Sequence, residues 1–599
     1  MSTSCAYPTH RFRQWMAADS VLPDSQNGFR EGYRTNNCSF ILRCAVDRSR
    51  ALNLPLYVAF VDLVNAFPST NLPTLWVKLF LRGARGPLLD WLRMLYSRME
   101  YAVKQSGPQG IECTVQFRSL WGILAGDTAS PGLFTCYLAD FLPPPDADDL
   151  LLSGRRISNI EEADDVALFV LRGVRALQGK LNYMHFHWCA QNFLAIGPPK
   201  SKGMIFGPIP SVLPTLLVGD EHLDFVDEFK YVGVTFKSTH RFIFASHYIN
   251  KASKARNMVF AIFAMESVVG TIPPHEGLQL YKSRTDPHLT FAAEVAVDVD
   301  DSFLALLEDV QVLFLRRLLG LHKRSMRALL FTETGIMPIR YRRVILALRY
   351  LRYLIKLPAH HYARAAFDDA CLLHADKKPS WVGDISLVLS RLRVPVVLKP
   401  VHLTDPHSIQ DLITEVEASC AATLQADIND SEKTVLLKNR VTSTGPVKLS
   451  DVLSYRHYLD VVVPAHRKAL TRLVTSCHGL AVNCLQWDSL RRRSIPREWR
   501  LCRFCHSEVE DECHAMLYCV ASPALTEERG VFFSDAQQLL PGVRAAVLTL
   551  PPPDSLRFLL GEKRVVGVLA KYAFRVLRIF DAVEVYLHPE LLRPTGLSP

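Results

Sequence analysis

The chain has 599 residues, of which 49% are hydrophobic and 21% charged, so we expect about two to four globular domains and exclude an intrinsically disordered chain. Lysine and arginine exceed aspartate and glutamate by 69 to 59, and this net charge of +10 fits a polyanionic partner without requiring one. No apolar run is long enough to span a membrane and the N-terminus shows no hydrophobic region of the signal-peptide type, so we expect an intracellular protein with no membrane partner.

Residues 1–240 mix short apolar runs with helical segments, which is typical of an α+β domain. The apolar runs are LYVAFVDL (56–63), VALFVL (166–171) and FKYVGVTF (229–236). Their length and their content of β-branched and aromatic residues favour strands.

The remainder of the chain shows a mostly helical pattern. Over 241–360 we expect helices, and one of them has a core-facing stripe formed by Phe303, Leu307, Val310, Phe314 and Leu318. Residues 361–450 have a weaker pattern with the breaks DKKPSW and RVPVVLKPVHLTDP, so we expect a linker region there. Residues 451–599 are predicted to be a mostly helical C-terminal region that ends in the amphipathic segment RVVGVLAKYAFRVLRIFDAVEVYL.

Two adjacent aspartates, Asp164 and Asp165, precede the apolar run VALFVL. The pair alone is weak evidence, because the chain also contains Asp148-Asp149, Asp300-Asp301 and Asp368-Asp369. Only the pair at 164 leads directly into a run typical of a buried strand, so a hairpin would hold both carboxylates at one point. The pair is either an ordinary polar turn or part of a metal site that needs a third oxygen ligand.

The apolar run that ends at Asp62 supplies a candidate third ligand. Phe67 lies five residues further on, and a helix is expected from about Leu72. Downstream, SLWGILAGDTASPGLF contains a glycine-marked turn and then Ser130-Pro131, which is typical of the start of a helix. The aspartate pair, NFLAIGPPKSKGMIF and EFKYVGVTF follow in that order.

This order of motifs resembles the palm of reverse transcriptases, in particular those of non-LTR (LINE-type) retrotransposons. The resemblance begins at QNGFREGYRTNNCSFIL, runs through FKYVGVTF and continues into FLRRLLGLHKRSMRALLFTETGIMPIRYRR, so it covers most of the chain. It implies a right-hand polymerase, with partial fingers and a palm of antiparallel sheet and packed helices over 1–240 and a helical thumb over 241–360. The implied activity is RNA-directed DNA polymerisation in the nucleus, with an RNA template, a DNA primer or target and deoxynucleoside triphosphates.

Nucleotidyl transfer by such an enzyme uses two Mg²⁺ ions about 3.5 to 4 Å apart, which activate the primer hydroxyl and stabilise the leaving group. By resemblance, Asp62 and Asp164 would bridge both ions, and Asp165 would contribute to the ion on the primer side. The backbone carbonyl of Val61 or Leu63 would assist. Carboxylate and carbonyl oxygens are the ligands that such hard cations prefer.

The resemblance also implies roles for residues around the nucleotide. Phe67 would be the aromatic gate that collides with a ribose 2′-hydroxyl; the alternative is an ordinary core phenylalanine. Lys200, or Lys202, would lie near the pyrophosphate as a general acid; the alternative is a solvated lysine. The turn Ala125-Gly126 would lie beside the incoming nucleotide.

The chain departs from the family pattern at three places. Ala125-Gly126 stands where the family usually has Gln-Gly, and Glu162, preceded by Glu161, stands where an aromatic residue usually precedes Ala-Asp-Asp. Only some 25 residues precede QNGFR, so the chain looks truncated relative to the family's fingers and endonuclease, and no acidic set near the C-terminus completes a nuclease site. The alternative function is therefore a catalytically decayed fragment that only binds RNA or DNA.

The segment CRFCHSEVEDECHAMLYC (502–519) contains Cys502, Cys505, His514 and Cys519 in the spacing C-x2-C-x8-H-x4-C. Four sulfur and nitrogen donors in this pattern predict one Zn²⁺ ion held as in a zinc knuckle, with a helix from about Asp511 presenting the histidine. His506 and Cys513 are spare candidates, and reduced cysteines in a small core are the alternative. LINE-type proteins commonly end in a similar finger.

A basic stretch precedes this segment, with nine lysines or arginines against two acids between Pro464 and Cys505. Basic side chains neutralise phosphates, and tryptophans such as Trp487 can stack on bases. We expect nucleic-acid binding by a surface that contains Arg491, Arg492, Arg493, Trp499, Arg500 and Arg503.

Overall fold

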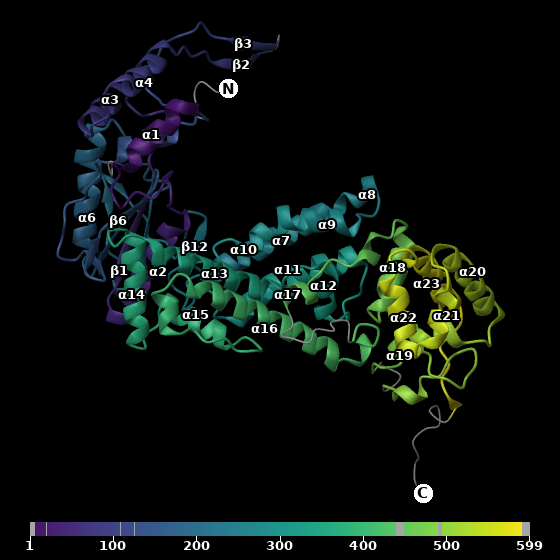
Figure 1. Cartoon of the computed structure of the whole chain (residues 1–599). Helices are drawn as coiled ribbons and strands as arrows, with labels where there is room; N and C mark the ends of the chain where they lie inside the picture. Colours follow the sequence, from purple (N-terminus) through teal and green to yellow (C-terminus); the bar gives the residue numbers. More distant parts are fainter. Residues whose placement is uncertain are drawn as a thin grey trace.

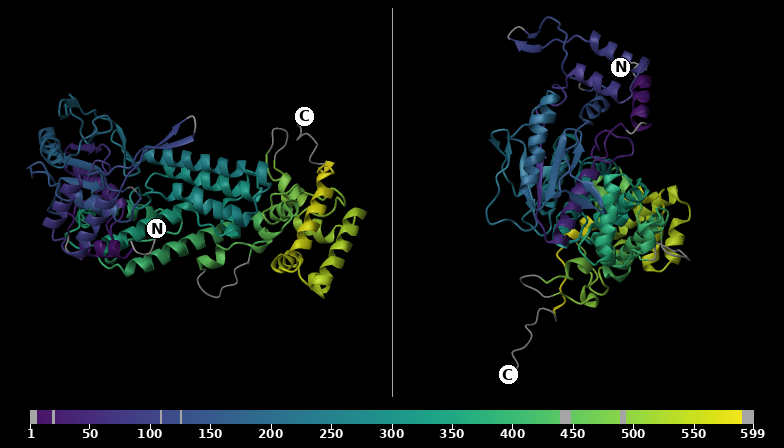
Figure 2. Two further views of the ribbon diagram at one scale, coloured as in Figure 1. Left: turned by 90° about the horizontal axis from the view of Figure 1, so that it is seen from above. Right: turned by 90° about the vertical axis from the view of Figure 1, so that its left-hand side faces the viewer.

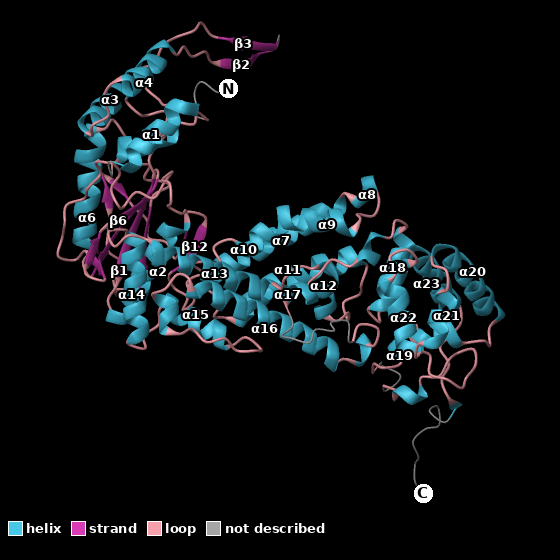
Figure 3. Ribbon diagram, viewed as in Figure 1, coloured by secondary structure: helices cyan, strands magenta, loops and turns pink. Residues whose placement is uncertain are grey.

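The computed structural model describes residues 6–18, 21–107, 110–124, 126–438, 448–488 and 494–589. Figure 1 shows a curved molecule with a small β-sheet at one end, a long group of helices in the middle and a second group of helices towards the C-terminus. Figure 3 shows that the strands are confined to the N-terminal part. The predicted mixture of helices and antiparallel strands is confirmed.

Four antiparallel strands form the central sheet, in the order β6-β7-β1-β8. They are β1 (Leu56–Val61), β6 (Asn159–Glu162), β7 (Asp165–Leu171) and β8 (Lys202–Phe206). All of β1 is buried, and its alternate residues belong to two cores, with Leu56, Val58 and Phe60 in one and Tyr57, Ala59 and Val61 in the other. Because both faces of the sheet are covered, the strand is a continuous apolar run and not an alternating one.

Helices cover both faces of this sheet. Helix α2 (Asn36–Leu52) contributes to the core on one face, and α6 (Val174–Asn182) to the core on the other. The helices predicted near Leu72 and at Ser130 are confirmed as α3 (Leu72–Leu81) and α5 (Ser130–Leu138). The other helices here are α1 (Ala6–Ala18) and α4 (Pro87–Arg98).

Small two-stranded hairpins accompany the four-stranded sheet in the N-terminal part of the chain. Figure 1 shows α3, α4 and the β2–β3 hairpin leading away from it as an arm. The hairpin strands are β2 (Lys104–Gly107), β3 (Gly110–Cys113), β4 (Leu150–Leu152), β5 (Arg155–Ile157), β9 (Leu217–Val218), β10 (Glu221–His222), β11 (Glu228–Tyr231) and β12 (Val234–Lys237).

The middle of the molecule is helical, as predicted for 241–360. Its helices are α7 (Ala245–Ala264), α8 (Glu266–Val269), α9 (Pro274–Leu280), α10 (Asp286–Thr290), α11 (Asp301–Leu319), α12 (Arg327–Thr334) and α13 (Ile339–Lys356). The predicted stripe lies on α11, where Leu307, Val310, Phe314 and Leu318 are buried and Phe303 packs against the same core. Asp300 accepts a hydrogen bond from Ser302 N at 2.9 Å and caps this helix.

The structure differs from the linker predicted over 361–450. That range contains α14 (Tyr362–Ala375), α15 (Trp381–Ser390) and α16 (Ser408–Asp430). Phe367, Trp381 and Val416 are buried in the core that also covers one face of the sheet. The proline-rich and charged breaks are the connections between these helices, and each helix has an apolar stripe that the breaks obscured in the sequence.

The helices from α18 onwards form the far end of the molecule, as Figure 1 and the left view of Figure 2 show. They are α18 (Pro464–Val474), α19 (Ala481–Cys484), α20 (Pro523–Leu539), α21 (Val543–Thr549), α22 (Pro552–Gly561) and α23 (Val566–Asp581). The short helix α17 (Leu449–Val452) precedes them and contacts α16. Helix α23 confirms the predicted amphipathic helix, although it ends at Asp581. In the described ranges no helix has both the length and the apolar character needed to cross a membrane.

Short helical turns join the longer elements at Tyr183–Cys189, Tyr281–Thr285, Pro400–Leu403, Glu432–Thr434, His457–Asp460, Arg497–Trp499 and His514–Tyr518. The last of these belongs to the predicted zinc segment. It packs within the same core as α20 and α23, so this segment is not an independent finger but part of the C-terminal helical group.

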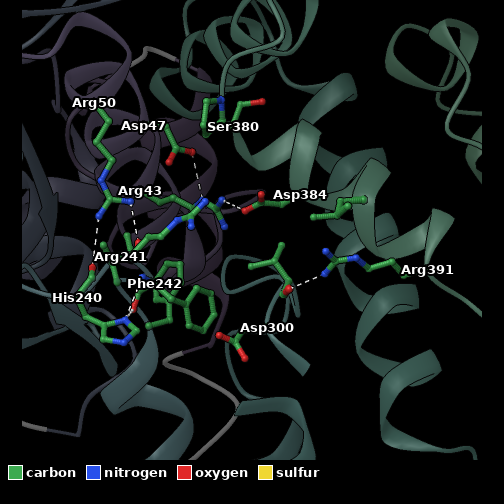
Figure 4. A pocket seen from close by; sticks show the side chains of 15 residues that line it. Arg43, Asp47, Arg50, His240, Arg241, Phe242, Asp300, Ser380, Asp384 and Arg391 are labelled. Atoms are coloured by element: carbon green, nitrogen blue, oxygen red, sulfur yellow. Dashed lines mark hydrogen bonds and ion pairs between the residues drawn. The ribbon is translucent and has the colours of Figure 1, made fainter. Parts of the chain in front are cut away.

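A cavity of about 660 Å³ lies where α2, the loop before α7 and α15 meet (Figure 4). Its charged groups largely satisfy one another: Arg43 donates from Nε to Asp47 at 3.3 Å and from Nη2 to Asp384. At its margins Arg50 donates to Arg241 O at 3.0 Å. The side chains that line this cavity therefore connect the sheet region to the helices that follow it, and their role is structural.

Candidate active site and metal centre

The three predicted carboxylates meet at one end of the central sheet. Strand β1 ends at Val61, which pairs with Val166 of β7, so Asp62 and Asp165 occupy the same end of neighbouring strands. Asp164 lies in the turn directly before β7. Burial raises the pKa of Asp164, and the charge of Asp62 raises it further. Burial also raises the pKa of Asp165, and both other aspartates add to the effect.

Backbone bonds hold Asp62 in this position. Its N–H donates to Ser201 Oγ at 3.0 Å, and its carbonyl oxygen accepts from Gly197 N at 2.8 Å. The same loop carries Lys200, whose exposed Nζ lies 3.8 Å from Asp62 Oδ2. Lys202 instead bonds to Asp224 at 2.8 Å, so of the two predicted lysines only Lys200 lies beside the aspartates.

The segment Gln26-Asn27-Gly28 supports the turn that carries Asp164. Gln26 Oε1 accepts from Ala163 N at 2.9 Å, and Gln26 Nε2 donates to Ala163 O at 3.2 Å and to Glu161 Oε2 at 3.1 Å. Ala163 has a φ of 58°, a left-handed conformation that a non-glycine residue adopts only when its surroundings hold it. Sequence reasoning gave this segment no role, although Gln, Asn and Gly in succession favour side-chain-to-backbone bonding in turns.

We expect Gly28→Ala to lower the free energy of unfolding by about 1–3 kcal/mol, because the added methyl group displaces the turn. That methyl would lie 2.4 Å from Ala163 N. The matched control is Gly179→Ala in α6, where a methyl meets nothing within 4 Å; it should be neutral or stabilising by up to about 1 kcal/mol. Urea unfolding measures both, and equal stabilities would show that this segment does not support the turn.

Phe67 lies beside the turn that precedes α5. Its ring stacks on Phe134 with centroids 4.4 Å apart, and its carbonyl oxygen accepts from Ile123 N at 3.2 Å. Gly126 is exposed and has a φ of 85°, which suits a glycine. Ala125 lies outside the described residues.

The two glutamates that depart from the family pattern are largely withdrawn from solvent. Burial raises the pKa of Glu161 to about 8, although Asn159 and Gln26 donate hydrogen bonds to it. Burial also raises the pKa of Glu162 to about 7, with a smaller contribution from the charge of Asp165. At neutral pH these groups therefore add less negative charge to the site than the sequence suggests.

The structure brings together Cys502, Cys505, His514 and Cys519, whose candidate ligand atoms lie within 4.8 Å of one another. The Sγ atoms of Cys502 and Cys519 are 3.8 Å apart, and Cys505 Sγ lies 3.5 Å from His514 Nε2. This group could bind a metal ion such as Zn²⁺, which takes sulfur and nitrogen donors in a tetrahedron. The three aspartates are not gathered as closely as this.

Local structure positions each of these four side chains. Leu501 pairs with Val509 to form a tight hairpin around the first two cysteines. Asp511 Oδ1 accepts from His514 N at 2.9 Å and begins the turn that presents the histidine. The spare candidates point elsewhere: His506 stacks on Tyr586 at 4.0 Å, and Cys513 Sγ contacts Pro552 O at 3.2 Å.

The structure corrects the nucleic-acid surface predicted around the zinc segment. Arg503 is only 6% exposed, forms an ion pair with Glu510 and also donates to backbone carbonyls, so it has no charge to offer a phosphate. Arg500 donates to Ile495 O at 2.8 Å and Val482 O at 3.0 Å. The guanidinium groups of both arginines therefore donate to backbone carbonyls of this region, which would otherwise lack these partners.

Of the other residues predicted for this surface, Trp499 is half-buried, with its ring 4.9 Å from that of His588. Arg491, Arg492 and Arg493 lie outside the described residues. The predicted surface is therefore not assembled by the described residues that were expected to form it.

No protein-family model matches the chain, and no curated protein matches its sequence. One solved structure to which it is similar is telomerase from Candida albicans in complex with a TWJ fragment of telomeric RNA, at 8% sequence identity and a TM-score of 0.26. The similarity covers 59% of this chain and 56% of the telomerase chain. A TM-score of this size does not establish a shared fold, so the function is inferred from the chain's own residues.

Proposed function

We propose that the chain is a nucleic-acid polymerase of the reverse-transcriptase type in which Asp62, Asp164 and Asp165 hold Mg²⁺. The observation that carries the proposal is the meeting of these carboxylates, about 100 residues apart in sequence, at one end of two paired strands. Burial raises the pKa of both Asp164 and Asp165, and the charges of the neighbouring aspartates, which repel one another, raise it further. A hard divalent cation relieves this repulsion and prefers oxygen ligands, so the donor set fits Mg²⁺.

Bound Mg²⁺ would supply the charge that activates a primer 3′-hydroxyl and stabilises the departing pyrophosphate. The chain's own residues orient the carboxylates: Ser201 and Gly197 hold the backbone of Asp62, and Gln26 holds the turn before Asp164. Lys200, on the exposed side of Asp62, is the cation that would face the pyrophosphate and donate a proton to it.

The finer assignment is an RNA-directed DNA polymerase of a LINE-type element, with an RNA template, a DNA primer or target and deoxynucleoside triphosphates as partners. It is supported by the motif order from QNGFR to FKYVGVTF and by Phe67, whose ring packs beside the turn that would receive the nucleotide. The C-terminal cysteine–histidine group would hold one Zn²⁺ ion.

A second candidate is a catalytically inactive nucleic-acid-binding protein that keeps the same scaffold. The observation that favours it is Glu162, which stands beside Asp165 where the family has an aromatic ring. Ala125, which stands where the family has glutamine, also favours the inactive protein.

Primer extension separates the two candidates. The full chain is incubated with a poly(rA) template, an oligo(dT) primer and thymidine triphosphate, with and without Mg²⁺. Extension that requires Mg²⁺ supports the polymerase. Binding of the primed template without extension in Mg²⁺ or Mn²⁺ supports the inactive scaffold.

We expect Phe67→Val to admit ribonucleotides more readily, because the smaller side chain leaves room for a 2′-hydroxyl. The ratio of kcat/KM for a deoxynucleotide to that for the matching ribonucleotide should fall by about 10-fold or more, since a steric clash is removed from only one substrate. The control is Phe186→Val, which changes an exposed ring distant from Phe67 in the sequence. This variant should keep the wild-type ratio. An unchanged ratio in Phe67→Val would exclude the gate role.

A further inference from the structure

Four basic side chains gather where the loop between α11 and α12 meets the C-terminal helices. This cationic cluster consists of Arg316, Arg324, Lys433 and Arg472, all of which lie close enough to His322 for their charges to act on it. The pKa of His322 is lowered by burial and then by each of these four charges. The members come from segments more than 150 residues apart, so only folding brings them together.

Specific contacts hold the cluster in place. Arg316 donates from Nε to Ser325 Oγ at 3.0 Å and from Nη2 to Ser325 O at 2.8 Å. Arg472 Nε donates to Gly320 O at 3.3 Å. These hydrogen bonds hold Arg316 and Arg472 against the loop 320–325 and so fix the distance between the two guanidinium groups.

Trp487 is the aromatic centre of the cluster and is 37% exposed. Lys433 Nζ lies 3.9 Å from its ring centroid, and Arg324 Cζ lies 5.6 Å from it. A tryptophan face attracts cations without neutralising them, so it holds two positive charges near each other while leaving both available to an anion.

No acid neutralises the cluster within the described part of the chain. None of its four cations forms an ion pair with a described aspartate or glutamate, and Arg324 and Arg472 are exposed. Two neighbouring arginines, by contrast, do form ion pairs. Arg317 pairs with Glu266 at 3.9 Å. Arg327 pairs with Asp309 at 3.0 Å. Cations left unpaired this close together repel one another, and a multivalent anion would relieve that repulsion.

We propose that the cationic cluster with Trp487 binds the phosphodiester backbone of a nucleic-acid strand. A strand presents closely spaced negative charges to a group of cations, and binding releases its counterions. Arg316, Arg324 and Lys433 lie outside the basic stretch that the sequence indicated between Pro464 and Cys505, whereas Arg472 and Trp487 belong to it. The inference does not depend on the proposed polymerase activity, because it stands on charge and geometry about the C-terminal helices.

The test is fluorescence anisotropy of the full chain with labelled single-stranded RNA, or DNA of the same sequence, of about 20 nucleotides, over a range of salt concentrations. We expect Arg324→Gln/Lys433→Gln to weaken binding about 10-fold or more. The slope of log affinity against log salt should become shallower by about 0.7 for each phosphate that the variant no longer neutralises. The two labelled strands show whether RNA or DNA is preferred.

The matched control is Arg317→Gln/Arg327→Gln, which removes the same net charge from ion-paired positions nearby. It should leave affinity and salt slope close to wild type. An equal loss in both double variants would mean that overall charge alone attracts the strand and would overturn the proposal. So would unchanged binding in Arg324→Gln/Lys433→Gln, or a preference of the wild-type cluster for anionic lipid vesicles over both strands.

A third variant tests whether Trp487 contributes to binding. Trp487→Ala should weaken binding several-fold because the two cations lose the ring that holds them, and Trp487→Phe should recover much of the affinity. Thermal unfolding of each variant separates loss of the site from loss of the fold. Equal binding by the wild type and a folded Trp487→Ala would remove Trp487 from the site.

Discussion

Asp164→Asn is expected to abolish nucleotide incorporation, by at least about 10³-fold, in a Mg²⁺-dependent primer-extension assay. The amide keeps the shape of the carboxyl group but cannot hold a divalent cation. The same change should leave the free energy of unfolding unchanged or slightly higher, because burial and Asp62 already make the charged form of Asp164 unfavourable. Thermal unfolding of the variant tests this second part.

The control for that experiment is Asp220→Asn, which removes an exposed carboxylate from the turn between β9 and β10. It should retain wild-type incorporation, because this carboxylate lies outside the three-aspartate site. Activity in Asp164→Asn close to that of the control would show that the three aspartates are not the catalytic site.

Cys505→Ser is expected to remove the bound metal and to lower the free energy of unfolding by more than about 3 kcal/mol, because the binding energy of a structural metal is also folding energy. The serine oxygen is a poor replacement for a thiolate ligand of Zn²⁺. Metal content measured on the purified chain, together with calorimetric unfolding before and after addition of a chelator, gives both quantities.

The matched control is Cys513→Ser, which changes a neighbouring cysteine whose sulfur contacts Pro552 O and not the four-residue group. It should keep its metal and should remain sensitive to the chelator. If Cys505→Ser binds as much metal as the control, the four side chains are reduced cysteines and a histidine in a core, and the metal assignment is wrong.

The sequence was sufficient to predict the strands β1 and β7 and the end of the sheet at which Asp62, Asp164 and Asp165 lie, while the role of these aspartates stays a prediction. An apolar run that ends in aspartate and a second run that begins with aspartate place their acids at the same end when the strands pair in opposite directions, as β1 and β7 do. The cysteine spacing was equally informative, because a two-residue gap restricts the first pair to one tight turn. In both cases the local sequence pattern determines where its own side chains lie.

Features that depend on distant parts of the chain could not be predicted. The pattern over 361–450 was interpreted from its prolines, whereas its helices are stabilised by a core shared with the sheet. In the sequence alone, Arg503 looks like a phosphate-binding arginine. Only its ion pair with Glu510 shows that its role is structural. The position of Trp487 between Lys433 and Arg324 depends on loops that approach each other only in the folded chain.

Arg503 lies between Cys502 and Cys505 of the candidate metal group, and this position has a consequence for how the C-terminal region unfolds. Its guanidinium donates to the carbonyl oxygens of Gly479, Phe580 and Val583, so it spans the entry to α19 and the end of α23. A bound metal would constrain the backbone of this hairpin and, with it, the direction of the Arg503 side chain. Release of the metal would leave buried carbonyl groups without donors, at about 1–3 kcal/mol for each. Metal dissociation and detachment of the last helix should therefore be a single cooperative event.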